Sequence, residues 1–172
     1  MATALTSENV QDAWSALADD VRTAVLLTLR NGRPFGSHVA YVFGPDWTRA
    51  YLHLSRLALH TQHLLSDPHM SLFIAEPDGP EKNPLALRRM NLQGEAAILS
   101  PDAPAHDEIK QRYLERFPQA EMMFGFGDFA LWELQLEDAH FLLGFGHAFV
   151  SSAATPTRWM HQKVERMASR KD

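Results

Sequence analysis

The Asn31-Gly32 pair is the feature that most constrains the fold, because it lies between two alternating runs, "VRTAVLLTLR" and "RPFGSHVAYVF". Asn and Gly readily adopt the positive φ angles of a two-residue β-turn. The arrangement therefore predicts a tight hairpin of two antiparallel strands, and a sheet built on it.

Further strands and short helices are predicted along the chain. Strands are expected over 49–55, 69–76, 88–99 and 128–145, the last broken near Glu137-Asp138. Helices are expected over about 7–18, 57–66 and 104–117, and in a C-terminal tail at about 156–168. Six or seven sequential antiparallel strands close best as a barrel, since closure removes exposed strand edges. The prediction is a mainly-β fold with flanking helices.

Length and composition narrow the function classes. The 172 residues are 45% hydrophobic, which fits one domain over 1–172. The net charge of -5, with scattered basic residues, argues against nucleic acid as a partner. The absence of cysteine excludes disulfides, thiolate metal sites and thiol nucleophiles. With no signal peptide and no long apolar run, we expect no membrane association and a cytoplasmic location.

The junction between the strand at 49–55 and the following helix is a candidate anion site. A helix start presents free N–H groups and a favourable dipole, and Ser55, Arg56 and Thr61 add donors. The alternative is that Ser55 only caps the helix and Arg56 is solvated. His60 and His63 share a helix face, but no carboxylate accompanies them, so no metal site is assigned. No hydrolase or nucleotide signature is present, and no catalytic residue is assigned.

Five blocks in a specific order resemble the FMN-binding split barrels related to pyridoxamine 5'-phosphate oxidase, and most closely the haem-utilisation branch. The blocks are "TLRNGRPFGSHVAYV", "LHLSRLALHTQHLLSDPHMSLFI", "RRMNLQGEAAIL", "RYLERFPQAEMMFGFGDFALWEL" and "FLLGFGHAFV". The resemblance implies a six-stranded split β-barrel that works as a homodimer with two ligand sites at the subunit interface.

For an FMN-binding member, the resemblance implies roles for eight positions. Ser37, His38 and Val39 would line the flavin ring, and Ser55 and Arg56 would approach the ribityl chain or phosphate. His60 and Thr61 would hold the phosphate, and Arg89 would reach across from the second subunit. The oxidase has an Arg-Lys pair where this chain has Leu59 and His60, and its C-terminal substrate residues have no counterpart here, which argues against vitamin B6 synthesis.

The haem-utilisation branch implies a second reading, in which His161 is an axial iron ligand supported by Asp128. Asp128 could equally hydrogen-bond within a turn. The leading interpretation is thus an FMN-binding, flavin-dependent oxidoreductase that acts on an unknown small molecule. The alternatives are a haem-binding or haem-degrading utilisation protein and a non-catalytic ligand-binding module.

Overall fold

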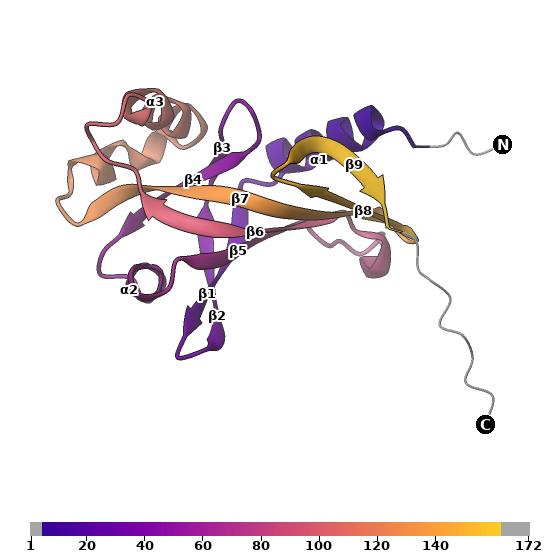
Figure 1. The fold of residues 1–172 in the computed structure, drawn as a ribbon, viewed down its shortest axis with the longest axis horizontal. Coiled ribbons are helices and arrows are strands. Elements are labelled where there is room, and N and C mark those ends of the chain that lie inside the picture. Colours follow the sequence, from indigo (N-terminus) through magenta and orange to yellow (C-terminus); the bar gives the residue numbers. More distant parts are fainter. Residues whose placement is uncertain (1–4, 163–172) are drawn as a thin grey trace.

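The computed structural model describes residues 5–162 as one curled antiparallel sheet with helices at its margins (Figure 1). The strands are β1 (Thr23–Arg30), β2 (Arg33–Ala40), β3 (Val42–Phe43), β4 (Arg49–Ser55), β5 (His69–Ala75), β6 (Arg89–Ile98), β7 (Phe129–Gly144), β8 (His147–Ser152) and β9 (Thr155–His161). The helices are α1 (Ser7–Asp20), α2 (Leu59–Ser66), α3 (His106–Arg116) and the 3-10 helices η1 (Pro84–Ala86) and η2 (Pro118–Gly125). The predicted mainly-β fold with flanking helices is confirmed. None of these helices is long and apolar enough to cross a membrane.

The Asn31-Gly32 turn forms the predicted hairpin. Its two residues have positive φ angles of 52° and 71°, and Arg30 pairs directly with Arg33 across the turn. Positive φ at both central positions is the pattern of a type I′ turn, whose twist matches that of paired strands. The two turn residues thereby set the register of β1 against β2.

The strand order explains why the sheet curls. Neighbouring strands run β2-β1-β5-β6-β7-β4-β3, and β8 and β9 continue from β7. β2 and β3 lie at opposite ends of this order, yet only Tyr41 separates them in the chain. Because one residue spans only about 4 Å, the two ends of the sheet must curl towards each other. The result is a half-barrel consistent with a split barrel, although the sheet has nine strands where six are expected.

The main hydrophobic core lies inside this curl. Leu26, Leu72 and Leu92 occupy directly paired positions on β1, β5 and β6, and all three are fully buried. Helix α1, predicted over about 7–18, closes one side of the core with the buried side chains of Val10, Trp14 and Leu17, spaced to share one helix face.

The C-terminal tail differs from the prediction. A helix over about 156–168 is wrong for the described part, where β9 extends to His161; the rest of that range lies outside the described residues. The side chain of Trp159 gives the physical reason. It is buried, its ring centroid lies 5.7 Å from that of Trp14, and its indole N–H donates to Gln11 Oε1 at 2.7 Å. Docking of this side chain on α1 holds the segment as a strand beside β8.

The predicted break near Glu137-Asp138 is a β-bulge within one continuous strand. Gly94 pairs with Leu136 and Gln93 pairs with Asp138, which leaves Glu137 as the extra residue. A bulge bends a strand without ending it. β7 can therefore pair with β4 along its first half and with β8 along its second.

A second, smaller core lies between β4, α3 and η2. Ile109, Tyr113 and Phe117, which are spaced to share one face of the helix predicted over 104–117, are buried there. His53 of β4 lies at its edge, with its ring stacked on that of Phe124 at 3.8 Å and 9°. Burial, with smaller effects from Lys110 and His106, lowers the pKa of His53 to about 4. Its imidazole is neutral at pH 7.

This lowered pKa predicts a pH-dependent stability. The unfolded chain binds a proton at His53 near its ordinary pKa of about 6.5, whereas the folded chain binds it only near pH 4. Between these values the unfolded state holds more protons, so stability should fall as pH decreases from about 6.5 to 4. Thermal melting of wild type and His53→Gln across this window tests it. The variant should show a shallower decline, and an identical decline would assign the effect to other groups, such as His60.

Candidate functional site

The strongest candidate site residues meet where β4 ends. Ser55 Oγ donates a hydrogen bond to Asp128 Oδ2 at 2.6 Å and accepts one from the Leu57 N–H at 3.1 Å. The Arg56 N–H donates to the Asp128 carbonyl oxygen at 2.7 Å. We call Ser55, Arg56 and Asp128 the Asp128 corner. Of the side-chain donors predicted to hold a phosphate, the Ser55 hydroxyl is thus already bound to Asp128, whereas Arg56 is tied to Asp128 only through its backbone.

The neighbouring helix α2 contributes little to phosphate binding. Thr61 is fully buried, so its hydroxyl does not reach the surface where a ligand would lie. His60 is half-buried, and its pKa is lowered by burial and by the nearby His63. A neutral imidazole gives a phosphate no counter-charge. His63 itself is buried, with Nδ1 lying 3.0 Å from Thr28 Oγ1, which removes it from the conceivable metal pair.

The side chains of the Asp128 corner are a poor match for the phosphate group of FMN. The exposed Arg56 side chain has no hydrogen bond or ion pair within residues 5–162 and could meet an anion. However, the Asp128 carboxylate lies at the same corner, and like charges at short range in a partly buried site repel. The corner holds one oriented carboxylate and a single uncommitted cation, so its residues do not fit a flavin phosphate.

The predicted ring-lining residues alternate between the two faces of edge strand β2. Ser37 and Val39 pair with the core-facing Leu26 and Ala24 of β1, whereas His38 pairs with Val25 on the opposite, outer face. Since neighbouring strand side chains point to opposite faces, the three side chains do not line one surface together.

The outer face of the sheet carries a continuous row of side chains. Direct cross-strand pairs join His38, Val25, Phe73, Asn91, His140, Val150 and Met160, from β2 to β9. Directly paired residues point to the same side of a sheet, and every member of this outer-face row is exposed or half-buried. Arg89 lies one row away, where it pairs with Leu142, and its Nη1 donates to the Leu87 carbonyl at 3.1 Å. Four of the seven residues in the row are apolar, which suits a second protein surface.

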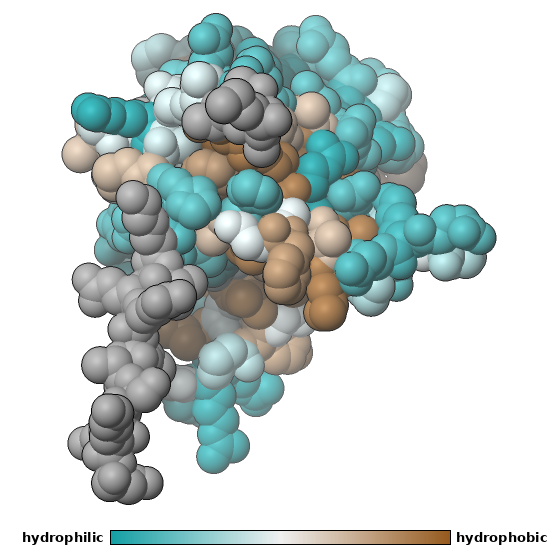
Figure 2. All heavy atoms as spheres, turned by 90° about the vertical axis from the view of Figure 1, so that its right-hand side faces the viewer, coloured by the Kyte–Doolittle hydropathy of each residue, from teal (hydrophilic) through white to brown (hydrophobic). Residues whose placement is uncertain are grey.

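His161 lies on the last described strand, at the far end of the sheet from the Asp128 corner. It is exposed, and its ring centroid lies 5.2 Å from that of Phe149 and 6.3 Å from that of His147. The side chains of Phe145 and Met160 are 80% and 56% exposed. Figure 2 looks onto this end of the molecule and shows apolar surface surrounded by polar surface. An exposed imidazole offers the iron ligand that a haem needs, and the apolar side chains exposed at this end of the molecule offer surface for the macrocycle. Met160 belongs to the outer-face row and points to the face opposite that of His161.

Asp128 and His161 of one chain lie at opposite ends of β7. Asp128 precedes the first residue of β7, whereas His161 pairs with Phe149, which pairs with Phe141 near the other end. Strands rise about 3.3 Å per residue, so about 40 Å of strand separates Phe129 from Phe141 (Figure 1). One chain alone therefore does not bring the predicted ligand and its supporting carboxylate together.

Two features of these sites have no local signal in the sequence. Ser55 and Asp128 are 73 positions apart and meet only through the pairing of β4 with β7. His147 lies near His161 because of the unpredicted pairing of β8 with β9. Within the described range, no group of three or more His, Asp or Glu side chains could hold a metal ion.

Comparisons with known proteins agree with the fold. The model of the pyridoxamine 5'-phosphate oxidase family matches residues 10–143. The chloroplast haem oxygenase HOZ of Arabidopsis thaliana is 32% identical over 121 residues, which cover 70% of this chain and 35% of that protein. The haem oxygenase HutZ of Vibrio cholerae is 26% identical over 133 residues, covering 76% and 73% of the two chains. The chain thus spans about a third of the length of the chloroplast relative.

A solved structure supports the same conclusion. The haem-binding protein from Mycobacterium smegmatis superposes with a TM-score of 0.77 at 23% identity, covering 90% of this chain and 61% of that one. At this identity the likeness establishes the fold. Since the family model spans most of the sequence, the chain belongs to the pyridoxamine 5'-phosphate oxidase family, and within that family it is similar to the haem-utilisation branch.

Proposed function

We propose that this protein binds haem at a site shared between two copies of the chain. The observation that carries the proposal is the Ser55 hydrogen bond to Asp128, 2.6 Å long, which turns the expected phosphate corner into an oriented carboxylate. A carboxylate held in this way repels a phosphate and accepts an N–H from an imidazole. FMN is the leading expectation from the sequence, and this contact supports the alternative, haem.

Each residue has a defined role in this proposal. His161 would provide the imidazole nitrogen for the iron, and its second ring nitrogen would donate to Asp128 of the partner subunit. Ser55 binds the other carboxylate oxygen and thereby fixes the orientation of Asp128. Bound haem would supply a redox-active iron. His161 would hold that iron, and Asp128 and Ser55 would orient the histidine.

The partner in this proposal is a second copy of the chain. Asp128 and His161 of one chain lie at opposite ends of β7, so a site containing both residue types requires two subunits. The outer-face row offers an apolar surface for that contact, with Val25, Phe73, Val150 and Met160 in line. A symmetric dimer would contain two equivalent sites.

The two relatives named haem oxygenases favour haem as a substrate of this protein. The proposal thus extends from haem binding to haem degradation, and the first step, binding, is the one that the Asp128 corner supports. The earlier expectations of a flavin-dependent reaction and of a non-catalytic module make different predictions for the same titration.

The test is a spectroscopic titration of wild type and Asp128→Asn with haemin and, separately, with FMN. Wild type should give a saturable Soret band, and the variant should bind haemin about 10 to 100 times more weakly, the usual effect of losing a hydrogen-bond partner of a metal-bound histidine. Asp102→Asn, an exposed carboxylate in a turn, is the control and should match wild type. Tight FMN binding without haemin binding would support the flavin-dependent function. If neither ligand binds, the result would support the non-catalytic ligand-binding module.

A further inference from the structure

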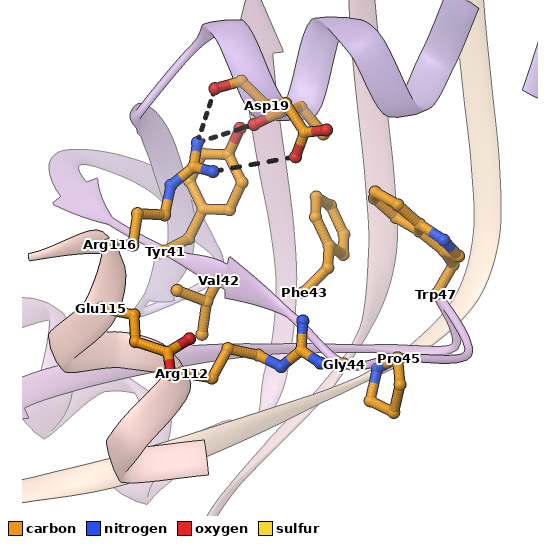
Figure 3. A pocket seen from close by; sticks show the side chains of 11 residues that line it. Asp19, Tyr41, Val42, Phe43, Gly44, Pro45, Trp47, Arg112, Glu115 and Arg116 are labelled. Atoms are coloured by element: carbon orange, nitrogen blue, oxygen red, sulfur yellow. Dashed lines mark hydrogen bonds and ion pairs between the residues drawn. The ribbon is translucent and has the colours of Figure 1, made fainter. Parts of the chain in front are cut away.

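An open cavity lies away from the Asp128 corner, near the start of β4. It has a volume of about 570 Å³ and is lined by the end of α1, by β3 with the turn that follows it, and by α3 (Figure 3). This volume is within the range of about 300 to 1,000 Å³ that is usual for small-molecule sites. Nothing in the proposed haem site uses it.

One wall of this cavity is aromatic and firmly packed. It contains Phe43 and Trp47, whose ring centroids lie 5.1 Å apart. Both rings also pack on Trp14 of α1, at 5.2 and 4.7 Å. Trp47 has a φ of 61°, a left-handed conformation that a bulky residue adopts only where its surroundings hold it. The wall is thus a preformed apolar surface.

Most polar groups of the cavity are already occupied. The Tyr41 hydroxyl lies 3.1 and 2.5 Å from the carbonyl oxygens of Ala18 and Val21. Arg116 Nη2 donates to the carbonyls of Ala18, Asp19 and Val21 at 2.7, 3.3 and 3.1 Å. These contacts cap the C-terminal end of α1. The Tyr41 hydroxyl and Arg116 Nη2 are thus committed, although Arg116 Nε, like Arg112 Nε, is buried without a hydrogen bond.

Arg112 differs from these groups, because its charge has no partner within residues 5–162. Its Nε is buried without a hydrogen bond, and no carboxylate lies within 4 Å of its guanidinium. In Figure 3 the guanidinium extends below Phe43 towards Gly44 and Pro45. Nη1 and Nη2 of Arg112 are not among the buried unpartnered atoms, so these are the nitrogens that a ligand in this cavity can reach.

We infer that this cavity binds a small organic monocarboxylate with an apolar body. The planar guanidinium of Arg112 pairs with a carboxylate through parallel hydrogen bonds, and the apolar body lies against Phe43 and Trp47. The charges at the margin favour a single negative charge. Asp19 and Glu115 are exposed there, and Arg116 already offsets one of them, with its Nη1 3.9 Å from Asp19 Oδ1. A phosphate dianion carries two negative charges beside the carboxylate of Glu115, and Arg112 alone would not balance them.

Two probes of the same shape test the inference. Naphthalene-2-carboxylate and the neutral naphthalene-2-carboxamide are titrated into the full chain by calorimetry, with NMR detection of the Trp47 indole and Arg112 Nε–H signals. The carboxylate should bind at least 10 times more tightly than the amide and should shift both signals. Arg112→Gln should remove this preference, whereas Glu115→Gln should preserve or strengthen carboxylate binding.

Other results would overturn the inference. Equal affinity for the two probes, carboxylate binding that survives Arg112→Gln, or the absence of carboxylate binding to wild type would each do so. If Arg112→Gln melts at the same temperature as wild type, a loss of carboxylate binding reflects the lost guanidinium and not unfolding. Should that variant unfold, Arg112→Lys replaces it, and a reduced preference for the carboxylate is still expected because the two parallel hydrogen bonds are lost.

Discussion

Replacing His161 by alanine should remove the Soret band of the haemin complex and weaken haemin binding by more than the 10 to 100-fold expected for Asp128→Asn. The physical reason is that His161 contacts the iron in this account, whereas Asp128 acts only on the second nitrogen of the imidazole. His161 is exposed and makes no side-chain hydrogen bond within the described residues, so its loss should leave the fold intact. The measurement is a haemin titration at 400 nm with a thermal melt of the same sample.

His147→Ala is the matched control for this prediction. Its ring lies 6.3 Å from that of His161 on the same exposed surface, so it shares the environment without the proposed role. We expect near wild-type haemin affinity for this variant. If His147→Ala loses haemin binding and His161→Ala keeps it, the iron ligand is His147. That outcome contradicts the proposed site.

The largest effect on stability is expected at Gly94, where β6 meets the bulge of β7. A Cβ atom added at Gly94 would lie 1.9 Å from the carbonyl oxygen of Gln135 and 2.9 Å from its carbonyl carbon. Both are backbone atoms, so no side-chain rotation relieves the clash. Gly94→Ala should therefore destabilise the fold by about 3 kcal/mol or more, at the upper end of overpacking effects. Urea unfolding at fixed protein concentration measures this loss.

Gly125→Ala provides the comparison. A Cβ atom at this position meets nothing within 4 Å, and its φ lies outside the left-handed region. Its midpoint in urea should stay close to that of wild type. If Gly94→Ala also unfolds at the wild-type midpoint, the close approach of β6 to β7 at the bulge is not a constraint on the sequence.

Local signals in the sequence predict much of the fold. The Asn31-Gly32 turn sets the first hairpin because its residue types permit positive φ. The stripe of Ile109, Tyr113 and Phe117 marks the buried face of α3 because helical spacing places these residues on one side. In both cases the determining interactions lie within a few residues of each other.

The tail illustrates where such signals fail. Met160, Val164 and Met167 have helical spacing, and this pattern predicts a helix. The buried Trp159 overrides it, because its side chain docks between α1 and β7 and holds the segment as β9. A contact with residues nearly 150 positions earlier, such as Gln11, has no local signature.

The candidate site was only partly predictable for the same reason. The sequence identifies Ser55, Arg56 and Asp128 individually, but the meaning of Ser55 changes once its hydroxyl is seen to bind Asp128. Ser55, which the sequence suggests as a helix cap or a phosphate ligand, instead orients the carboxylate of Asp128. The relation between Asp128 and His161 likewise depends on the length of β7, which separates them within one chain.

The most direct measurement of the central claim is the haem content of a mixed dimer of Asp128→Asn and His161→Ala subunits, each carrying a different affinity tag. If the site is shared, this dimer contains one intact site, formed by Asp128 of the His161→Ala subunit and His161 of the Asp128→Asn subunit. The account predicts wild-type haemin affinity at half the wild-type stoichiometry. A mixed dimer without any site of wild-type affinity would contradict it.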